Sequence, residues 1–172
     1  MNSTLCTIGF TKKTPEEFFR LLQEAGVQKV IDIRENRIGQ LSGFAKYPDL
    51  AFFLKRVAGI EYHAEPLLAP SLEIRRAYTH SRDWKQYEDS FLQLMRERGV
   101  PEKIDPERFE GRVALLCSEP TPDRCHRRLV ADLLAGHWKS LGHNIQVKHL
   151  VLEKPGRRRK KVTVKDDRTA PL

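Results

Sequence analysis

Long apolar runs, a secretory leader and a cysteine framework are all missing from this sequence. No apolar run approaches the ~18 residues that a membrane-spanning helix requires, and the N-terminus has no signal-peptide pattern. The three cysteines are an odd number, which argues against a set of structural disulfides. We therefore expect a cytoplasmic protein with no membrane partner. Its oligomeric state is left open.

Two common phosphate-binding motifs are also absent. Gly9 follows a short apolar run, but neither the GxGxxG pattern of dinucleotide-binding folds nor the Walker pattern is present. The sequence therefore gives no reason to expect a resident cofactor, and we expect none. We also expect no bound metal ion.

Excess positive charge is confined to the C-terminus. Of the charged side chains, eight basic and two acidic ones lie between Lys154 and Leu172, against 23 basic and 21 acidic ones in the rest of the chain. We expect one α/β domain over residues 1–153 and a basic tail over residues 154–172, whose order the sequence leaves open. The tail contains a run that favours contact with nucleic acid as much as it favours a solvated segment. This run is Arg157, Arg158, Arg159, Lys160 and Lys161.

Apolar strand patterns alternate with helical patterns along the body of the chain. Strands are predicted over residues 4–10, 27–33, 60–63, 113–117 and 144–152, and helices over residues 14–25, 48–58 and 82–99 and from residue 125 onward. The alternation predicts a mainly parallel, five-stranded, Rossmann-like sheet with helices on both faces. We expect the strand order 3-2-1-4-5, and a long irregular loop from residue 64 to about residue 80.

Polar side chains follow three of the predicted strands, and the carboxyl ends of parallel strands are where open α/β sheets place their sites. Asp32 and Arg34 point to the same side of an extended segment, where they either serve a site or pair with neighbouring charges. We expect the three strand ends to meet around one pocket. The strand-end residues are Gly9 and Thr11, Asp32 and Arg34, and Cys117 and Glu119.

The segment Cys125-His126-Arg127 opens the fourth predicted helix, and three interpretations remain open for its thiol. A helix N-terminus flanked by basic residues lowers a thiol pKa, which would make Cys125 a nucleophile. A zinc site with Cys117 would need a fourth ligand, and the spacing matches no standard zinc motif. A buried, packed thiol is the third interpretation. Arg127 at the helix N-terminus favours binding of an anion.

Several of these short motifs together resemble an uncharacterised family, domain of unknown function 488, from Thr7 to about Leu150. The motifs are Thr7-Ile8-Gly9, Asp32-Ile33-Arg34, Gly43-Phe44-Ala45-Lys46, Tyr62-His63 through Leu67, and Leu116-Cys117-Ser118-Glu119 with Cys125-His126-Arg127. The family often has histidine after the first glycine, where this chain has Phe10. The resemblance implies an α/β fold and a shared pocket, and it implies no particular reaction.

Our leading hypothesis is an enzyme that acts on a phosphate-bearing substrate, a nucleotide or nucleic acid, by hydrolysis or group transfer such as N-glycosidic cleavage. Asp32 or Glu119 would act as general base or nucleophile, His63 would assist proton transfer, and Cys125 is a candidate nucleophile. The expected substrate-binding residues are Gly9, Thr11, Arg34, Arg37, Arg75, Cys117, His126 and Arg127. The alternatives are a non-catalytic nucleic-acid-binding or adaptor module, and a thiol redox or metal-binding protein that uses Cys117 and Cys125.

Overall fold

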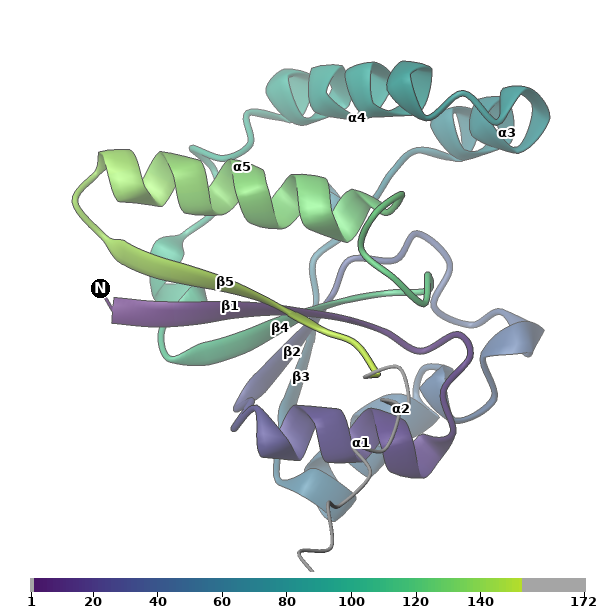
Figure 1. Ribbon diagram of the computed structural model, residues 1–172, viewed down its shortest axis with the longest axis vertical. Helices are drawn as coiled ribbons and strands as arrows, with labels where there is room; N and C mark the ends of the chain where they lie inside the picture. The colour runs from purple at the N-terminus through teal and green to yellow at the C-terminus, as the bar shows by residue number, and fades with distance from the viewer. Residues whose placement is uncertain (1, 153–172) are drawn as a thin grey trace, which may run out of the picture.

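The computed structural model describes residues 2–152, and the predicted basic tail therefore lies outside the described residues. Five parallel strands form one sheet in the order β3-β2-β4-β1-β5, which confirms the predicted α/β fold class (Figure 1). The strands are β1 Asn2–Gly9, β2 Lys29–Asp32, β3 Glu61–Ala64, β4 Arg112–Cys117 and β5 Asn144–Leu150.

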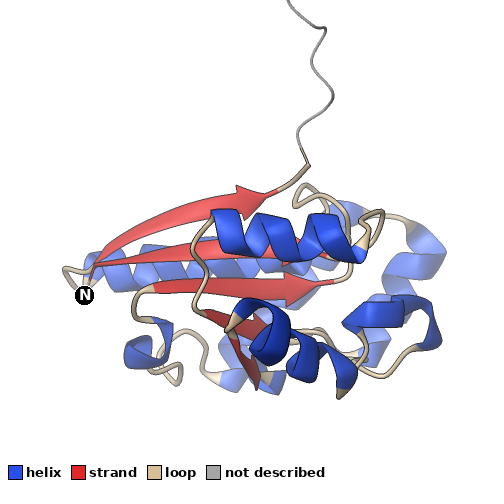
Figure 2. Ribbon diagram, turned by 90° about the horizontal axis from the view of Figure 1, so that it is seen from below, coloured by secondary structure: helices blue, strands red, loops and turns tan. Residues whose placement is uncertain are grey.

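Helices cover both faces of the sheet (Figures 1 and 2). One face packs against α1 (Pro15–Glu24) and α2 (Asp49–Phe53), which continues as a π-helical turn over Leu54–Ala58. The other face packs against α4 (Trp84–Arg98) and α5 (His126–Ser140). In the described part of the chain, no helix combines the length and the apolar character needed to cross a membrane.

The N-terminus of α1 has the local structure that its sequence predicts. Thr14 Oγ1 accepts a hydrogen bond from the Glu17 backbone amide at 3.2 Å, and the Glu17 carboxylate accepts one from the Thr14 amide at 2.8 Å. Pro15 occupies the first helical position, where a backbone donor is not needed. The reciprocal bonds satisfy two amides that the helix leaves unpaired, so α1 begins at a defined residue.

The predicted strand order was wrong at one point, because β4 lies between β2 and β1. Its backbone pairs with both neighbours, with Leu116 opposite Asp32 and Cys117 opposite Gly9. Burial cannot distinguish these orders, since β1 and β4 are both apolar strands that need cover on two faces. The chain passes from β1 to β2 over one face of the sheet and from β4 to β5 over the other. The carboxyl ends of the adjacent strands β4 and β1 therefore lie where the connections leave in opposite directions, which is where α/β sheets bind ligands.

The prediction of an irregular loop up to residue 80 was also wrong. After a short 3-10 turn (Pro66–Leu68), the residues Leu72–Ser81 form helix α3, which begins after Ser71. The Ser71 hydroxyl accepts a hydrogen bond from the Ile74 amide at 3.3 Å. None of the α3 residues is buried, so the helix has little of the apolar periodicity that sequence analysis requires.

Candidate functional site

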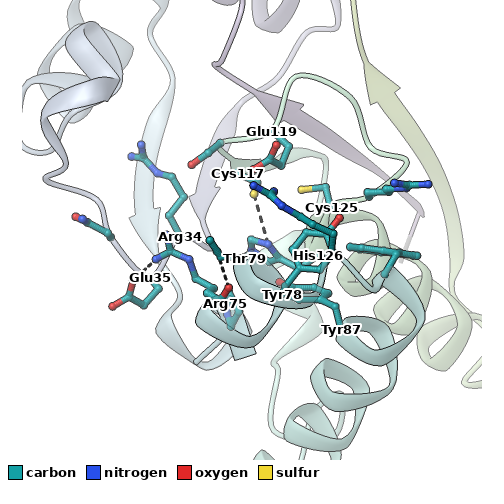
Figure 3. Close-up of a pocket in the computed structure, with 16 residues that line it drawn as sticks. Arg34, Glu35, Arg75, Tyr78, Thr79, Tyr87, Cys117, Glu119, Cys125 and His126 are labelled. Carbon is teal, nitrogen blue, oxygen red and sulfur yellow. Dashed lines mark hydrogen bonds and ion pairs between the residues drawn. The ribbon is translucent and has the colours of Figure 1, made fainter. Parts of the chain in front are cut away.

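A cavity of about 350 Å³ opens beside the carboxyl end of β4, between the loop after β2, helices α3 and α4, and the start of α5 (Figure 3). Most of its lining side chains are charged, polar or aromatic. The residues on which the following description depends are Arg34, Glu35, Arg75, Tyr78, Arg82, Trp84, Tyr87, Cys117, Glu119, Arg124, Cys125 and His126. Side chains that follow β2 and β4 meet at this cavity, whereas Gly9 and Thr11, at the end of β1, do not line it.

The loop over residues 118–124, which joins β4 to α5, is held through three consecutive backbone carbonyls. The Thr11 amide donates to the Ser118 carbonyl at 3.1 Å. Arg127 Nη1 donates to the Glu119 carbonyl at 2.6 Å, and Lys13 Nζ donates to the Pro120 carbonyl at 3.3 Å. Burial, together with the nearby Arg127 charge, lowers the pKa of Lys13. Two cations and one amide thus fix the backbone from which the Glu119 side chain projects.

Gly9 lies against this loop so closely that no side chain fits there. A Cβ atom built on Gly9 would lie 1.7 Å from the Glu119 carbonyl oxygen and 2.9 Å from Arg127 Nη1. Gly9 and Thr11, which we expected to bind substrate, both contact the loop that carries Glu119.

Cys117 and His126 form a close pair on the cavity wall (Figure 3). Cys117 Sγ lies 3.4 Å from His126 Nδ1, and His126 Nε2 lies 3.0 Å from the Ile33 carbonyl oxygen. Because a carbonyl oxygen only accepts, Nε2 carries a hydrogen and Nδ1 faces the sulfur. The carbonyl of Ile33, the residue after β2, therefore sets the tautomer of the neutral His126 ring.

The Cys117 thiol is the more acidic of the two thiols in the cavity. Burial would raise its pKa, but the hydrogen bond from Cys125 and the charge of His126 lower the pKa of Cys117 well below its ordinary value. Burial alone would lower the pKa of His126, whereas the adjacent Cys117 sulfur raises it above its ordinary value. The nucleophilic character that the sequence assigned to Cys125 therefore fits Cys117 better.

Cys125 is the residue immediately before α5 and is also buried. Burial and the neighbouring Cys117 sulfur raise the pKa of Cys125 above its ordinary value. Its Sγ accepts a hydrogen bond from Arg127 Nη1 at 3.3 Å. The donor atoms of Cys117, Cys125 and His126 all lie within 4.8 Å of one another, so these three residues could hold a metal ion.

Arg127 has a relative exposure of 0% and does not line the cavity. Its Nη1 atom donates to the Glu119 carbonyl and to Cys125, but Nε and Nη2 have no hydrogen-bond partner among residues 2–152. A buried guanidinium without a carboxylate partner is uncommon, because desolvating a charge is costly. Arg127 acts here as a support for the loop and as a source of positive charge behind the two thiols.

Asp32 and Arg34 bind each other at the end of β2. Arg34 Nε and Nη2 donate to the two carboxylate oxygens of Asp32 at 2.8 and 2.6 Å, and Tyr62 donates to Asp32 at 2.8 Å. Burial and the Asp32 charge raise the pKa of Tyr62 to about 12. The Phe10 ring lies under the guanidinium of Arg34, 5.3 Å from its central carbon. Arg34 therefore faces the cavity in a fixed orientation, and Asp32 positions it.

The structure brings together six of the residues predicted for the site and leaves others outside the cavity. The six that line it are Arg34, Arg75, Cys117, Glu119, Cys125 and His126. His63 lies on β3 with a half-exposed side chain beside Glu61, and Arg37 stacks on the ring of Tyr47. The basic run over residues 157–161 lies outside the described residues.

Sequence analysis did not identify two aromatic residues of the cavity wall, Trp84 and Tyr87, or two of its charged residues. Trp84 stacks on Tyr87 with the ring centroids 5.1 Å apart, and Tyr78 lies edge-on to Trp84 at 5.9 Å. Trp84 and Tyr87 fall at helical spacing in the sequence, and only their tertiary position shows that they border the cavity. The two charged residues are Arg82, which follows α3 with a positive φ of 54°, and Glu35. No sequence motif marked either of them as part of a site.

No curated protein and no solved structure matches the chain. A family match covers residues 14–134, a range that includes helices α1 to α4, the whole of β4 and the first part of α5 with the Cys125-His126-Arg127 segment. The match spans more than half of the 172 residues and confirms the resemblance noted in the motifs. The chain belongs to the family described as Domain of unknown function DUF488.

Proposed function

We propose that this protein is an enzyme that binds a phosphate-bearing substrate, a nucleotide or the end of a nucleic acid, and cleaves it by hydrolysis or group transfer. One observation carries the proposal: a single cavity presents four arginines, an aromatic wall and the Glu119 carboxylate. The four arginines are Arg34, Arg75, Arg82 and Arg124.

The arginines favour a phosphate group over a neutral ligand. A guanidinium presents several N–H groups in one plane and binds phosphate oxygens in pairs. Asp32 orients Arg34. Glu35 forms an ion pair with Arg75 (Figure 3), so two of the four arginines are held in place before a ligand arrives. The N-terminus of α5 lies at the same cavity and adds to the positive potential.

The aromatic side chains favour a nucleotide over a bare phosphate. Trp84 and Tyr87 are stacked with their ring planes 21° apart, and both line the cavity along with Tyr78. Nucleic-acid bases stack on aromatic rings, and each stacked base contributes ~1–3 kcal/mol to binding. A phosphate near the arginines and a base near this wall would use both halves of the cavity.

Glu119 is the carboxylate best placed for catalysis. Asp32 is excluded from that role because Arg34 and Tyr62 occupy its oxygens. The Glu119 carboxylate has no hydrogen bond or ion pair to any side chain among the described residues, although its backbone is held by Arg127. Burial and the Cys117 charge raise the pKa of Glu119. A fixed backbone and an unpaired carboxylate suit a general base or a nucleophile.

The experiment is a binding and turnover screen with nucleoside mono- and diphosphates, short single-stranded oligonucleotides and inorganic phosphate. Binding is followed by tryptophan fluorescence, because Trp84 lines the cavity whereas the second tryptophan, Trp138, is buried in the core. Turnover is followed by chromatographic detection of released base or phosphate. Glu119→Gln should abolish turnover while ligand binding is retained.

Two further variants separate binding from catalysis. Arg124→Gln should weaken binding by about tenfold or more, since a charge-assisted hydrogen bond contributes ~1.5–3 kcal/mol. Arg20→Gln, at an exposed position on α1, is the matched control and should bind as the wild type does. Unchanged turnover in Glu119→Gln would end the assignment of Glu119. If the wild type binds a compound of the screen tightly and turns over none of them, the protein is a non-catalytic binding module instead.

A further inference from the structure

We propose that Cys117, Cys125 and His126 bind a zinc ion through three protein ligands, with a fourth position open to the cavity. This inference goes beyond the proposed function, because it depends on the donor atoms and not on any substrate. It also departs from the sequence-based expectation of no bound metal ion.

The donor atoms have the separations that a tetrahedral zinc centre needs. Bond lengths of about 2.3 Å to sulfur and about 2.0–2.1 Å to nitrogen place a coordinated sulfur and nitrogen about 3.5 Å apart in a tetrahedron. Cys117 Sγ and His126 Nδ1 are 3.4 Å apart, and Cys125 Sγ lies within 4.8 Å of both. The three ligands could therefore reach one ion with little movement of their side chains.

The surroundings of His126 orient its ring for coordination. Nε2 donates to the Ile33 carbonyl, which leaves the lone pair of Nδ1 directed at the sulfur of Cys117 when the ring is neutral. A hydrogen bond from the second ring nitrogen to a backbone carbonyl is the usual outer-shell partner of a metal-binding histidine. The Phe91 ring packs against the imidazole with the centroids 5.6 Å apart and limits its rotation.

Arg127 supports a thiolate at Cys125. Its Nη1 atom donates to Cys125 Sγ at 3.3 Å, and its other two nitrogens have no partner among the described residues. A simple ion pair between Cys117 and His126 would leave this buried cation facing a neutral thiol. Zinc binding requires both sulfurs as thiolates, and the guanidinium then faces a negative charge.

The position of the cluster indicates a reactive centre and not a structural one. Structural zinc sites use four protein ligands, whereas catalytic sites use three and keep a position for water or substrate. Cys117, Cys125 and His126 all line the cavity that also contains Glu119. Two sulfurs and an imidazole favour zinc over the hard cations calcium and magnesium. A zinc ion there would supply a Lewis acid for a substrate oxygen or a water molecule.

The test uses the full chain, reduced and treated with a chelator, then titrated with cobalt(II) and, in competition with a chromophoric chelator, with zinc. We expect one equivalent of metal per chain, and an intense ultraviolet sulfur-to-cobalt band with the visible bands of a tetrahedral centre. Cys117→Ser, Cys125→Ser and His126→Asn should each weaken zinc binding beyond the ~100-fold that loss of an outer-shell partner costs.

Cys6→Ser is the matched control, because Cys6 is a buried free thiol on β1 that lies in the hydrophobic core and does not line the cavity. This variant should keep full metal affinity and the cobalt spectrum. A second measurement uses only the wild type: zinc should protect Cys117 and Cys125 from alkylation by a maleimide, as located by mass spectrometry.

Three results would overturn the proposal. They are the absence of stoichiometric binding by the folded wild type, binding that survives both Cys117→Ser and Cys125→Ser, and rapid alkylation of Cys117 that zinc does not slow. The last result would identify a metal-free thiolate paired with His126. No substrate enters these measurements, so their failure is distinguishable from failure of the nucleotide screen.

Discussion

The ends of β2 and β4 lie side by side in the sheet and carry similar sequence signals, but their electrostatics differ. At the end of β2, the carboxylate of Asp32 and the guanidinium of Arg34 satisfy each other. At the end of β4, two buried thiols, the Glu119 carboxylate and the guanidinium of Arg127 meet, and residues 2–152 supply neither a side-chain partner for Glu119 nor a full set of partners for Arg127. A charged residue that follows a buried strand is therefore expected at the carboxyl edge of the sheet. Whether it has a structural role or is available for chemistry depends on the groups that pair with it.

Removing one member of the closed pair should have the largest effect. Arg34→Met leaves the buried carboxylate of Asp32 without its cation, and breaking a buried pair in this way costs ~3–5 kcal/mol in the free energy of unfolding. Urea denaturation followed by circular dichroism measures this loss. Arg20→Met, at a half-exposed pair on α1, is the control and should change stability by less than ~1 kcal/mol. A loss no larger than that of the control would contradict a closed pair at β2.

Adding one methyl group beside the β4 loop should have the next largest effect. In Gly9→Ala, the new Cβ would lie 1.7 Å from the Glu119 carbonyl oxygen, so the loop must shift. Overpacking of this kind costs ~1–3 kcal/mol, and calorimetry should record a lower Tm. Gly136→Ala is the matched control, because a Cβ there meets no atom within 4 Å and α5 should gain up to ~1 kcal/mol. Equal Tm changes in both variants would show that Gly9 is not required by the loop.

Removing Arg127 should have the smallest effect, even though this side chain is more deeply buried than Arg34. Arg127→Met loses the hydrogen bond to the Glu119 carbonyl, which costs ~1–2 kcal/mol, but leaves no carboxylate behind. Urea denaturation of both variants, Arg127→Met and Arg34→Met, after chelator treatment compares their losses in the free energy of unfolding. If the two variants lose equal stability, Arg127 has an anionic partner that balances it as Asp32 balances Arg34, and the contrast between the strand ends fails.

Much of the fold could be predicted from the sequence because local chemistry determined it. The capping box at Thr14 starts α1 where expected, and the buried apolar runs became five parallel strands. The place of β4 could not be predicted, since a strand that is buried on both faces looks the same beside either neighbour. Helix α3 was missed because its stability comes from Ser71 capping and packing on α4 and not from a buried face of its own.

The location of the site could be predicted from the sequence, whereas the roles of its residues could be predicted only in part. Carboxyl ends of parallel strands share an edge, which is why Arg34, Cys117 and Glu119 were expected to meet and do line one cavity. Asp32 and Arg34 were expected to point the same way, but the sequence does not say that they point at each other. The order of acidity between Cys117 and Cys125 also depends on the position of His126, which only the folded chain determines.

The hydrogen bond from the His126 ring to Ile33 joins two parts of the cavity that are far apart in the chain. Ile33 immediately precedes Arg34, so a displacement of the imidazole would pull on the peptide unit that leads to Arg34. An occupant of the sulfur–imidazole cluster that moved the ring in this way would change the affinity for an anion at Arg34. By thermodynamic reciprocity, the factor by which the first changes the affinity for the second must equal the factor in the opposite direction.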